Sequence, residues 1–224
     1  MPINGEPMIY RQIERINKAT AIDELIVATS TDPSDDSLAE FLKTKGVRVF
    51  RGSHGDVLSR FLKIEMQVKP TAIIRFTGDC PLVMSELIDK MVERFYSHDV
   101  DYLSNTLEPT FPDGLDIEII RASSLAGLDK FELTDVEREH VTLGIYSRPA
   151  EFSCENFRGT QDLSNKRWTV DYLEDLVFVR QVYGAFQGRE AIFTLEDVLL
   201  FLASNPKLQS EISANRRNEQ LGDI

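Results

Sequence analysis

The chain has 224 residues, of which 42% are hydrophobic, and its formal net charge at pH 7 is −12. This length can bury one sizeable hydrophobic core, so we expect a single domain that covers residues 1–224. Two classes are disfavoured, because no run of eighteen apolar residues could span a membrane and no basic patch typical of nucleic-acid binding stands out.

The N-terminal part of the chain predicts helices and short strands in alternation. Apolar residues recur at helical spacing in the helices, whereas the strands are short runs of β-branched and other apolar residues. The expected helices cover residues 8–16, 34–45, 85–95 and a segment that starts at residues 56–61. The expected strands cover residues 25–28, 47–50, 72–74 and 100–103. This alternation predicts a mostly parallel sheet with helices on both faces, in which residues 72–74 form a buried parallel strand.

The pattern is less regular after the fourth expected strand. Further strands are expected over residues 116–120, 151–157 and 167–170. Further helices are expected near residues 123–130, 134–146 and 171–186, and after a capping box at residues 194–197.

Asp79 occupies a position typical of ligand binding in α/β proteins. It lies in the turn RFTGDCP, residues 75–81, between the third strand and the next helix. Gly78 is expected to let the chain turn sharply, and Pro81 ends the strand. Ligands of open α/β sheets bind beyond the carboxyl ends of the strands, where a carboxylate can hold Mg²⁺ against nucleotide phosphates. The alternative is that Asp79 only caps the turn or the next helix.

Asp171 is a second acidic residue that follows an apolar strand. It could bind a metal in the same way, or it could be the N-cap of the following helix, with Glu174 completing a capping box. The two roles are compatible, because a carboxylate has several lone pairs.

Other polar residues stand at turns or on apolar segments. Asp113 and Asp116 belong either to an ordinary Pro-Asp-Gly turn or to a loop that binds a hydroxylated ligand. Glu139 and His140 crowd a short helix, although a lone histidine is more often a buried structural residue. Arg75 lies on an apolar strand and therefore needs a buried acidic partner or an anionic ligand.

Several common chemistries have no motif in this sequence. No Ser/His/Asp set, zinc-binding cluster, Walker loop or G-x-G-x-x-G motif occurs. Cys80 and Cys154 have neither disulfide nor metal spacing, and residues 1–10 lack the features of a secretory signal, which favours free thiols in the cytoplasm. The residues themselves thus indicate a cytoplasmic α/β protein whose acidic strand ends suit a Mg²⁺–nucleotide complex.

A set of short segments together resembles the cytidylyltransferases of the SpsF type, which are named for spore coat polysaccharide synthesis. These are relatives of the enzymes that make CMP-sialic acid and CMP-3-deoxy-manno-octulosonate. Each segment is a weak signal, but the set is in order and extends over nearly the whole chain. The segments are residues 50–53, 56–58, 75–81, 104–106, 111–116, 137–142 and 167–171.

The resemblance implies a Rossmann-like nucleotidyltransferase fold, the nucleotide-diphospho-sugar transferase fold, with a small β-rich extension within residues 104–160. It also implies the reaction, in which a hydroxyl of a sugar or sugar acid attacks the α-phosphate of CTP and releases pyrophosphate. Asp79 and Asp171 are then expected to hold the catalytic Mg²⁺. Because the relatives are commonly homodimers, a homodimer is possible here.

The same resemblance suggests a set of substrate-binding residues in the matching segments. Four of them, Asp113, Asp116, Glu139 and His140, are expected to line the side of the site that holds the acceptor sugar. The whole expected set is Arg75, Gly78, Asn105, Asp113, Asp116, Glu139 and His140.

One departure from the family concerns the start of the sequence. The family opens with a strand and a loop of the type Ala-Arg-x-x-Ser-x-Arg-Leu-Pro-Gly-Lys, which wraps the triphosphate, and this sequence starts just after that loop. Without those residues the sheet is expected to have one strand fewer and an uncovered apolar strand edge. Two alternatives therefore stay open: a glycosyltransferase of related architecture that uses a nucleotide-sugar, and a non-catalytic nucleotide- or sugar-binding protein.

Overall fold

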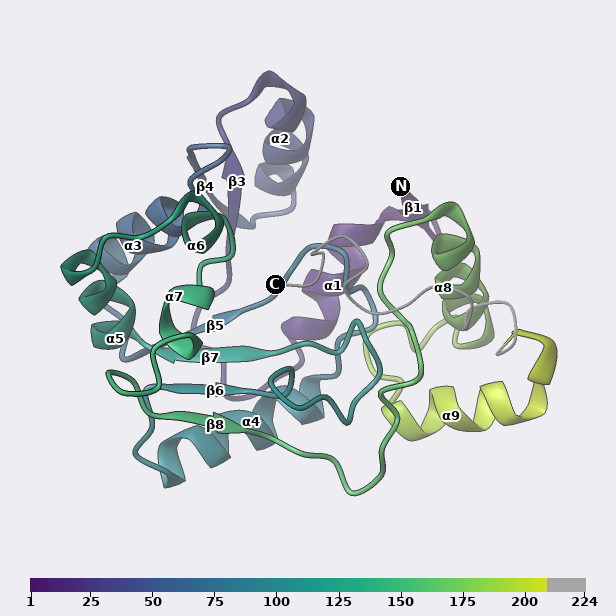
Figure 1. Cartoon of the computed structure of the whole chain (residues 1–224). Coiled ribbons are helices and arrows are strands. Elements are labelled where there is room, and N and C mark those ends of the chain that lie inside the picture. Colours follow the sequence, from purple (N-terminus) through teal and green to yellow (C-terminus); the bar gives the residue numbers. More distant parts are fainter. Residues whose placement is uncertain (209–224) are drawn as a thin grey trace.

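The computed structural model describes residues 1–208 and has the alternating helices and strands that the sequence predicts (Figure 1). The strands are β1 (Pro2–Ile3), β2 (Glu6–Pro7), β3 (Ile26–Ser30), β4 (Arg48–Gly52), β5 (Ala72–Arg75), β6 (Tyr102–Ser104), β7 (Glu118–Arg121) and β8 (Cys154–Asn156). The α-helices are α1 (Met8–Ile16), α2 (Asp36–Thr44), α3 (Val57–Val68), α4 (Ser85–Ser97), α5 (Ala122–Ala126), α6 (Asp135–Glu139), α7 (Leu143–Tyr146), α8 (Leu173–Ala185) and α9 (Leu195–Ser204). Within these residues no helix is long and apolar enough to cross a membrane.

The main sheet has four strands in the order β5–β7–β6–β8. β6 and β8 pair in parallel, whereas β7 is antiparallel to both β5 and β6. β5, β6 and β8 therefore point the same way, which agrees with a mostly parallel sheet into which β7 is inserted in the opposite direction. The prediction that residues 72–74 form a buried parallel strand is wrong: in the described chain β5 pairs only with antiparallel β7, and its four residues are half-buried.

Helices cover both faces of this sheet, as the sequence predicts. Leu103 and Ile119 are paired in register and belong to a core cluster that α1, α4, α8 and α9 complete, called here the α4 cluster. Tyr102 and Ile120 are also paired, and they belong to a second core with α3, α5 and α7, called here the α3 cluster. Neighbouring residues of a strand point to opposite faces, so each strand contributes to both cores.

β3 and β4 form a separate two-stranded parallel sheet, which lies above the four-stranded sheet in Figure 1. Over residues 1–208, β3 has no strand partner except β4, and β5 has none except β7. The expected open strand edge is therefore present in this structure. Both β3 and β5 have such an edge.

Local structure also differs from the sequence prediction over residues 134–146 and 167–170. Residues 167–170 form no strand, and only an isolated bridge joins Asp113 to Arg167. The helix expected over residues 134–146 is divided into α6 and α7, because Val141 between them has a φ of 51°. A β-branched residue rarely adopts this left-handed conformation. Its side chain is fully buried in the α3 cluster, whose packing offsets the local strain.

The helix starts agree better with the sequence. Asp56 caps α3 by accepting a hydrogen bond from the backbone of Ser59. Thr194 begins α9 with the predicted capping box. Thr134 begins α6 in the same way, together with Glu137.

Candidate functional site

The turn that carries Asp79 lies against the segment that carries Asp171, although ninety-two positions separate these residues in the sequence. The backbone N–H of Val170 donates a hydrogen bond of 2.9 Å to the carbonyl oxygen of Asp79. The hydroxyl of Thr169, a buried residue, donates to Asp79 Oδ2 at 3.1 Å. These two bonds bring the two expected metal-binding segments together.

Neither aspartate is used as a helix cap. The helix after Asp79 is α4, which begins after Met84 without a side-chain cap. The helix after Asp171 is α8, and the residue that accepts the hydrogen bonds at its start is Asp175, whose Oδ2 binds the backbone N–H groups of Asp171 and Tyr172. The capping alternatives for Asp79 on α4 and for Asp171 are therefore wrong, and both carboxylates serve other contacts.

Arg167 connects the acidic side chains of this region. It forms ion pairs with Asp171, with Asp113 at 3.3 Å and with Asp175 at 3.3 Å. Its own side chain is 7% exposed, and that of Asp175 is 4% exposed. One buried cation thus compensates three carboxylates and fixes where Asp113 and Asp171 lie relative to each other.

Gly114 lets the Asp113 turn approach the Asp171 segment closely. Its φ is +99°, and a Cβ atom on it would lie 2.4 Å from the backbone nitrogen of Thr169. The bond from the Trp168 N–H to the carbonyl oxygen of Asp113, at 2.6 Å, completes this contact. A side chain at position 114 would therefore push the predicted acceptor loop away from residues 168–169.

The pKa of the Cys80 thiol is affected by burial and by the negative charge around this site. Burial raises the pKa of its thiol well above the ordinary range, and the nearby carboxylates of Asp79 and Asp116 raise it further. Asp116 therefore lies close enough to Asp79 for both to act on one thiol. The thiol stays protonated at neutral pH, so it is not a nucleophile.

The donor chemistry of Asp79 and Asp171 fits a hard divalent cation, which prefers oxygen ligands. Within residues 1–208 no group of three or more His, Cys, Asp or Glu side chains is arranged to hold a metal. Mg²⁺ commonly takes only one or two carboxylates and completes its shell with water and substrate phosphates. The pair therefore suits a cation that arrives with a nucleotide better than a permanently bound one.

Arg75 has a buried acidic partner, which is the first of its two predicted explanations. It pairs with Glu118 on β7, and the two side chains are 17% and 11% exposed. Burial alone would lower the pKa of Arg75, but the carboxylate of Glu118 outweighs burial and raises it. Glu118 also accepts hydrogen bonds of 2.6 Å from Tyr102 and Thr142. This network accounts for Arg75 without a bound anion.

The importance of Glu118 was missed in the sequence. In the alternating segment 116–120, Glu118 is on the same side as Asp116, so the pattern gave no reason to expect it to be buried. Only the pairing of β5 with β7 shows that it lies directly opposite Arg75.

Two further expected substrate contacts have structural explanations. Asn105 is 1% exposed, and its amide group donates to Leu115 O and accepts from Ile117 N, both at 2.8 Å. This buried side chain thus holds the backbone of residues 115–117 in place. Gly78 lies in a turn, as predicted, but its φ is not in the left-handed region, so this backbone conformation does not itself require glycine. A Cβ there would make only an ordinary contact, 3.6 Å from Ile9.

Glu139 and His140 lie in a different part of the structure, at the end of α6. That helix packs on α3, where Arg138 pairs with Asp56 at 2.7 Å. Printed contacts link the segments of Asp79, Asp113 and Asp171, and Asp116 acts on the same Cys80 thiol as Asp79.

Comparison with known proteins agrees with the resemblance in the sequence. The chain matches the family described as "Cytidylyltransferase" over residues 1–209. It belongs to the cytidylyltransferase family. As a member of this family it is a nucleotidyltransferase enzyme, which confirms the predicted family, fold and type of enzyme.

Individual relatives support the assignment. The chain is 34% identical over 200 residues to the spore coat polysaccharide biosynthesis protein SpsF of Bacillus subtilis, covering 86% of this chain and 80% of that protein. A cytidylyltransferase of Leptospira borgpetersenii is similar in structure, with a TM-score of 0.88, 29% identity and coverage of 98% of this chain and 91% of the other. A synthetase for CMP-2-keto-3-deoxy-manno-octonic acid, solved with CTP, shares the fold, with a TM-score of 0.61, 16% identity and coverage of 83% and 90%.

Proposed function

We propose that this cytidylyltransferase transfers CMP from CTP to a hydroxyl of a sugar or sugar acid used in surface polysaccharide or glycan synthesis. The names of its relatives support this class of substrate, because one belongs to spore coat polysaccharide synthesis and several are 3-deoxy-manno-octulosonate cytidylyltransferases. A homodimer acting in the cytoplasm is part of the same proposal.

One observation carries the proposal: the direct contact between the Asp79 turn and residues 169–171. Two distant segments that each carry a predicted metal-binding aspartate are hydrogen-bonded to each other just after β5, which supports the proposal. This is where α/β sheets bind nucleotides. Asp79 and Asp171 would hold Mg²⁺, which neutralises phosphate charge and orients the reacting groups when it is bound.

The chain's own residues would position the acceptor. Asp113 and Asp116 would bind its hydroxyl groups, and Arg167 would keep Asp113 and Asp171 at a fixed separation. The acceptor oxygen bonds to the α-phosphorus of CTP, the bond from that phosphorus to the bridging oxygen breaks, and pyrophosphate leaves with the electron pair. The hydroxyl proton passes to a carboxylate or to water. Glu139 and His140, at the end of α6, would also contact the acceptor.

The metal role can be tested by replacing Asp79 or Asp171 with asparagine. Each carboxylate then becomes an uncharged group of the same shape, so we expect kcat/KM to fall by about 100-fold or more. Pyrophosphate release from CTP measures activity, and Mn²⁺ binding in the presence of CTP measures the metal site independently. Asp162→Asn is the matched control, because Asp162 is exposed and bonds only to Ser164.

The assay is run on the chain as it stands and on a version that also carries the family's opening strand and loop. Inactivity of the first version alone points to phosphate binding by that loop. The variants are compared in a version of the chain that is active. If Asp79→Asn or Asp171→Asn keeps full activity and Mn²⁺ binding in that version, the metal role is contradicted. Transfer of a sugar from a nucleotide-sugar, without pyrophosphate release, would instead identify the glycosyltransferase alternative. Nucleotide binding without either reaction would identify the non-catalytic one.

A further inference from the structure

The turn that carries Asp79 continues into a buried segment without regular structure. Residues 80–84 are all buried, and none of them belongs to a helix or a strand. Buried backbone carbonyl groups outside regular structure need hydrogen-bond donors from other parts of the protein. The donors that the fold supplies therefore show what holds this turn in place.

Helix α8 binds the turn through residues at both of its ends. Shortly before the helix begins, the N–H of Val170 donates to the carbonyl oxygen of Asp79 at 2.9 Å. Near the end of the helix, the hydroxyl of Tyr183 donates to the carbonyl oxygen of Pro81 at 2.8 Å. A helix places side chains more rigidly than a loop does. These two bonds therefore fix the turn relative to Asp171, which directly follows Val170.

Tyr183 is itself held by its packing. Its side chain is fully buried in the α4 cluster, and its ring lies edge-on to that of Phe193, with the ring centroids 5.4 Å apart. Burial raises the pKa of its hydroxyl above the ordinary value, so the hydroxyl keeps the proton that it donates. The donor thus has a fixed position from which it can hold the turn.

A second buried donor comes from α1. Arg15 is 2% exposed, and its Nε donates to the carbonyl oxygen of Val83 at 2.7 Å. The same guanidinium donates to the carbonyl oxygen of Phe193 at 2.8 Å and lies 3.7 Å from the centre of the Phe193 ring. Arg15 and Tyr183 therefore share one aromatic neighbour and hold the same segment of chain.

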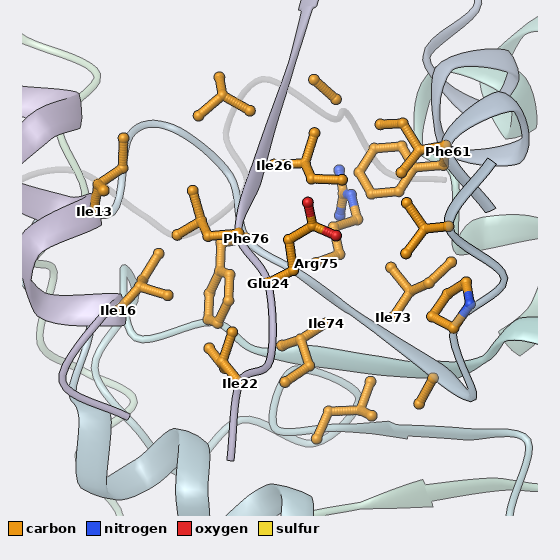
Figure 2. A pocket seen from close by; sticks show the side chains of 18 of the residues that line it. Ile13, Ile16, Ile22, Glu24, Ile26, Phe61, Ile73, Ile74, Arg75 and Phe76 are labelled. Atoms are coloured by element: carbon orange, nitrogen blue, oxygen red, sulfur yellow. The ribbon is translucent and has the colours of Figure 1, made fainter. Parts of the chain in front are cut away.

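Another face of α1 contacts the chain before Asp79. Ile13 and Ile16 line a cavity of about 670 Å³ that β3 and β5 also border (Figure 2). Gln12 lies on the same side, and its Nε2 donates to the carbonyl oxygen of Thr77 at 2.7 Å. Side chains of α1 thus hold the backbone on both sides of Asp79.

We propose that Tyr183 is a positioning residue for the metal site, whose hydrogen bond to Pro81 keeps the Asp79 carboxylate in place to bind Mg²⁺. This inference rests on the proposed metal role of Asp79. Loss of a group that orients a metal ligand commonly lowers metal affinity by about 10-fold to 100-fold. Tyr183→Phe removes only the donor and keeps the ring, so it isolates this one bond.

Tyr102→Phe is the matched control. Both tyrosines are fully buried and donate through the hydroxyl, but Tyr102 lies in the α3 cluster and donates to Glu118 at 2.6 Å. In a version of the chain that binds Mn²⁺ in the presence of CTP, Tyr183→Phe should weaken Mn²⁺ binding by about tenfold or more. Tyr102→Phe should leave Mn²⁺ binding unchanged. Because both variants lose the same group from a buried site, a difference between them is not a general effect of lower stability.

The reactivity of Cys80 tests the hold on the turn without metal, nucleotide or turnover. Cys80 follows Asp79 and is 3% exposed, so its alkylation by iodoacetamide requires the turn to open. Tyr183→Phe should speed this alkylation about fivefold, and Tyr102→Phe should not. Mass spectrometry of the labelled peptides measures the rate. Cys154 on β8 is the internal reference, and its rate should be the same in Tyr183→Phe as in the wild type.

The proposal is overturned if Cys80 in Tyr183→Phe reacts at the wild-type rate, or if it reacts equally fast in both variants. It is also overturned if Cys80 reacts faster but Mn²⁺ binding stays unchanged, because the metal site would then not depend on the hold. In both cases the proposed metal role of Asp79 stands. Failure of every wild-type version to bind Mn²⁺ with CTP would instead contradict that metal role, and this inference with it.

Discussion

At the scale of single residues, Arg167 organises the candidate site. The side chains around it belong to the turn at residue 113 and to the segment before α8, and they would repel one another without a cation between them. The carboxylate of Asp175 is nearly fully buried and also holds two backbone N–H groups. Removal of one partner from a buried ionic group leaves the others uncompensated, which is costly.

Arg167→Met should therefore destabilise the protein by about 3 kcal/mol at neutral pH. Denaturant unfolding measures this change. Arg158→Met is the matched control, because Arg158 pairs with Glu108 on the surface, where both side chains are more than 60% exposed. The control should change stability by less than about 1 kcal/mol. Equal losses in the two variants would show that the buried pairs around Arg167 are no stronger than a surface pair.

At the scale of elements, the carboxyl end of β3 is held by a single carboxylate. Asp35 Oδ2 accepts hydrogen bonds from the Ser30 hydroxyl at 2.6 Å, from the Thr29 hydroxyl at 2.7 Å and from the Ser30 N–H at 2.9 Å. The hydroxyl bonds from Ser30 and Thr29 lower the pKa of Asp35 from 3.8 to about 2. The bonds attach β3 to the start of α2, which matters because one edge of β3 is open.

Asp35→Asn should consequently have a stability cost that depends on pH. The pKa is lower in the folded state, so the carboxylate stabilises the protein above pH 4 and loses this effect as the pH falls toward 2. After allowance for solvent screening, we expect the variant to be less stable than the wild type by about 0.5 to 1 kcal/mol at pH 7. The free energies of unfolding of the variant and the wild type, measured with denaturant, should differ less at pH 3 than at pH 7. A difference that grows on acidification would contradict this assignment. Asp36→Asn, which removes an exposed pair with Arg51, is the control.

At the scale of the whole molecule, the two sheets differ in how many strands they pair. The inner strands of the four-stranded sheet each have two neighbours, whereas β3 and β4 pair only with each other in the described residues. β7 has hydrogen-bonded neighbours on both sides, and its first three residues are buried. β3 has one partner and lies beside the cavity. Regions with few buried contacts and open backbone edges unfold locally at lower free-energy cost.

Backbone amides of β7, such as those of Ile119 and Ile120, should therefore exchange at least about tenfold more slowly than those of Val27 and Ala28 in β3. Native-state hydrogen exchange measured by NMR on the chain tests this order. Protection of β3 equal to that of β7 would mean that the two sheets open together, as one cooperative unit.

Much of the fold was predictable from short-range patterns. Apolar spacing indicated α1, α4 and the short strands, and the polar residues before α3 and α9 marked their starts. These features depend on residues only a few positions apart, so they are readable without the fold. The family resemblance added roles for acidic residues that the sequence had already singled out, and the structure links the segments of Asp79, Asp113 and Asp171.

The pairing of distant residues was decided only by the tertiary structure. β7 lies between β5 and β6 in the opposite direction, so Glu118 meets Arg75 and no anion is required there. Arg167 links Asp113 and Asp171, and Asp175 takes the capping role that the sequence suggested for Asp171. The sequence by itself determined the elements, the family and the acidic character of the strand ends. Packing chose the partners, because a buried charge or an open strand edge is satisfied by whichever group the fold brings near it, at any distance along the chain.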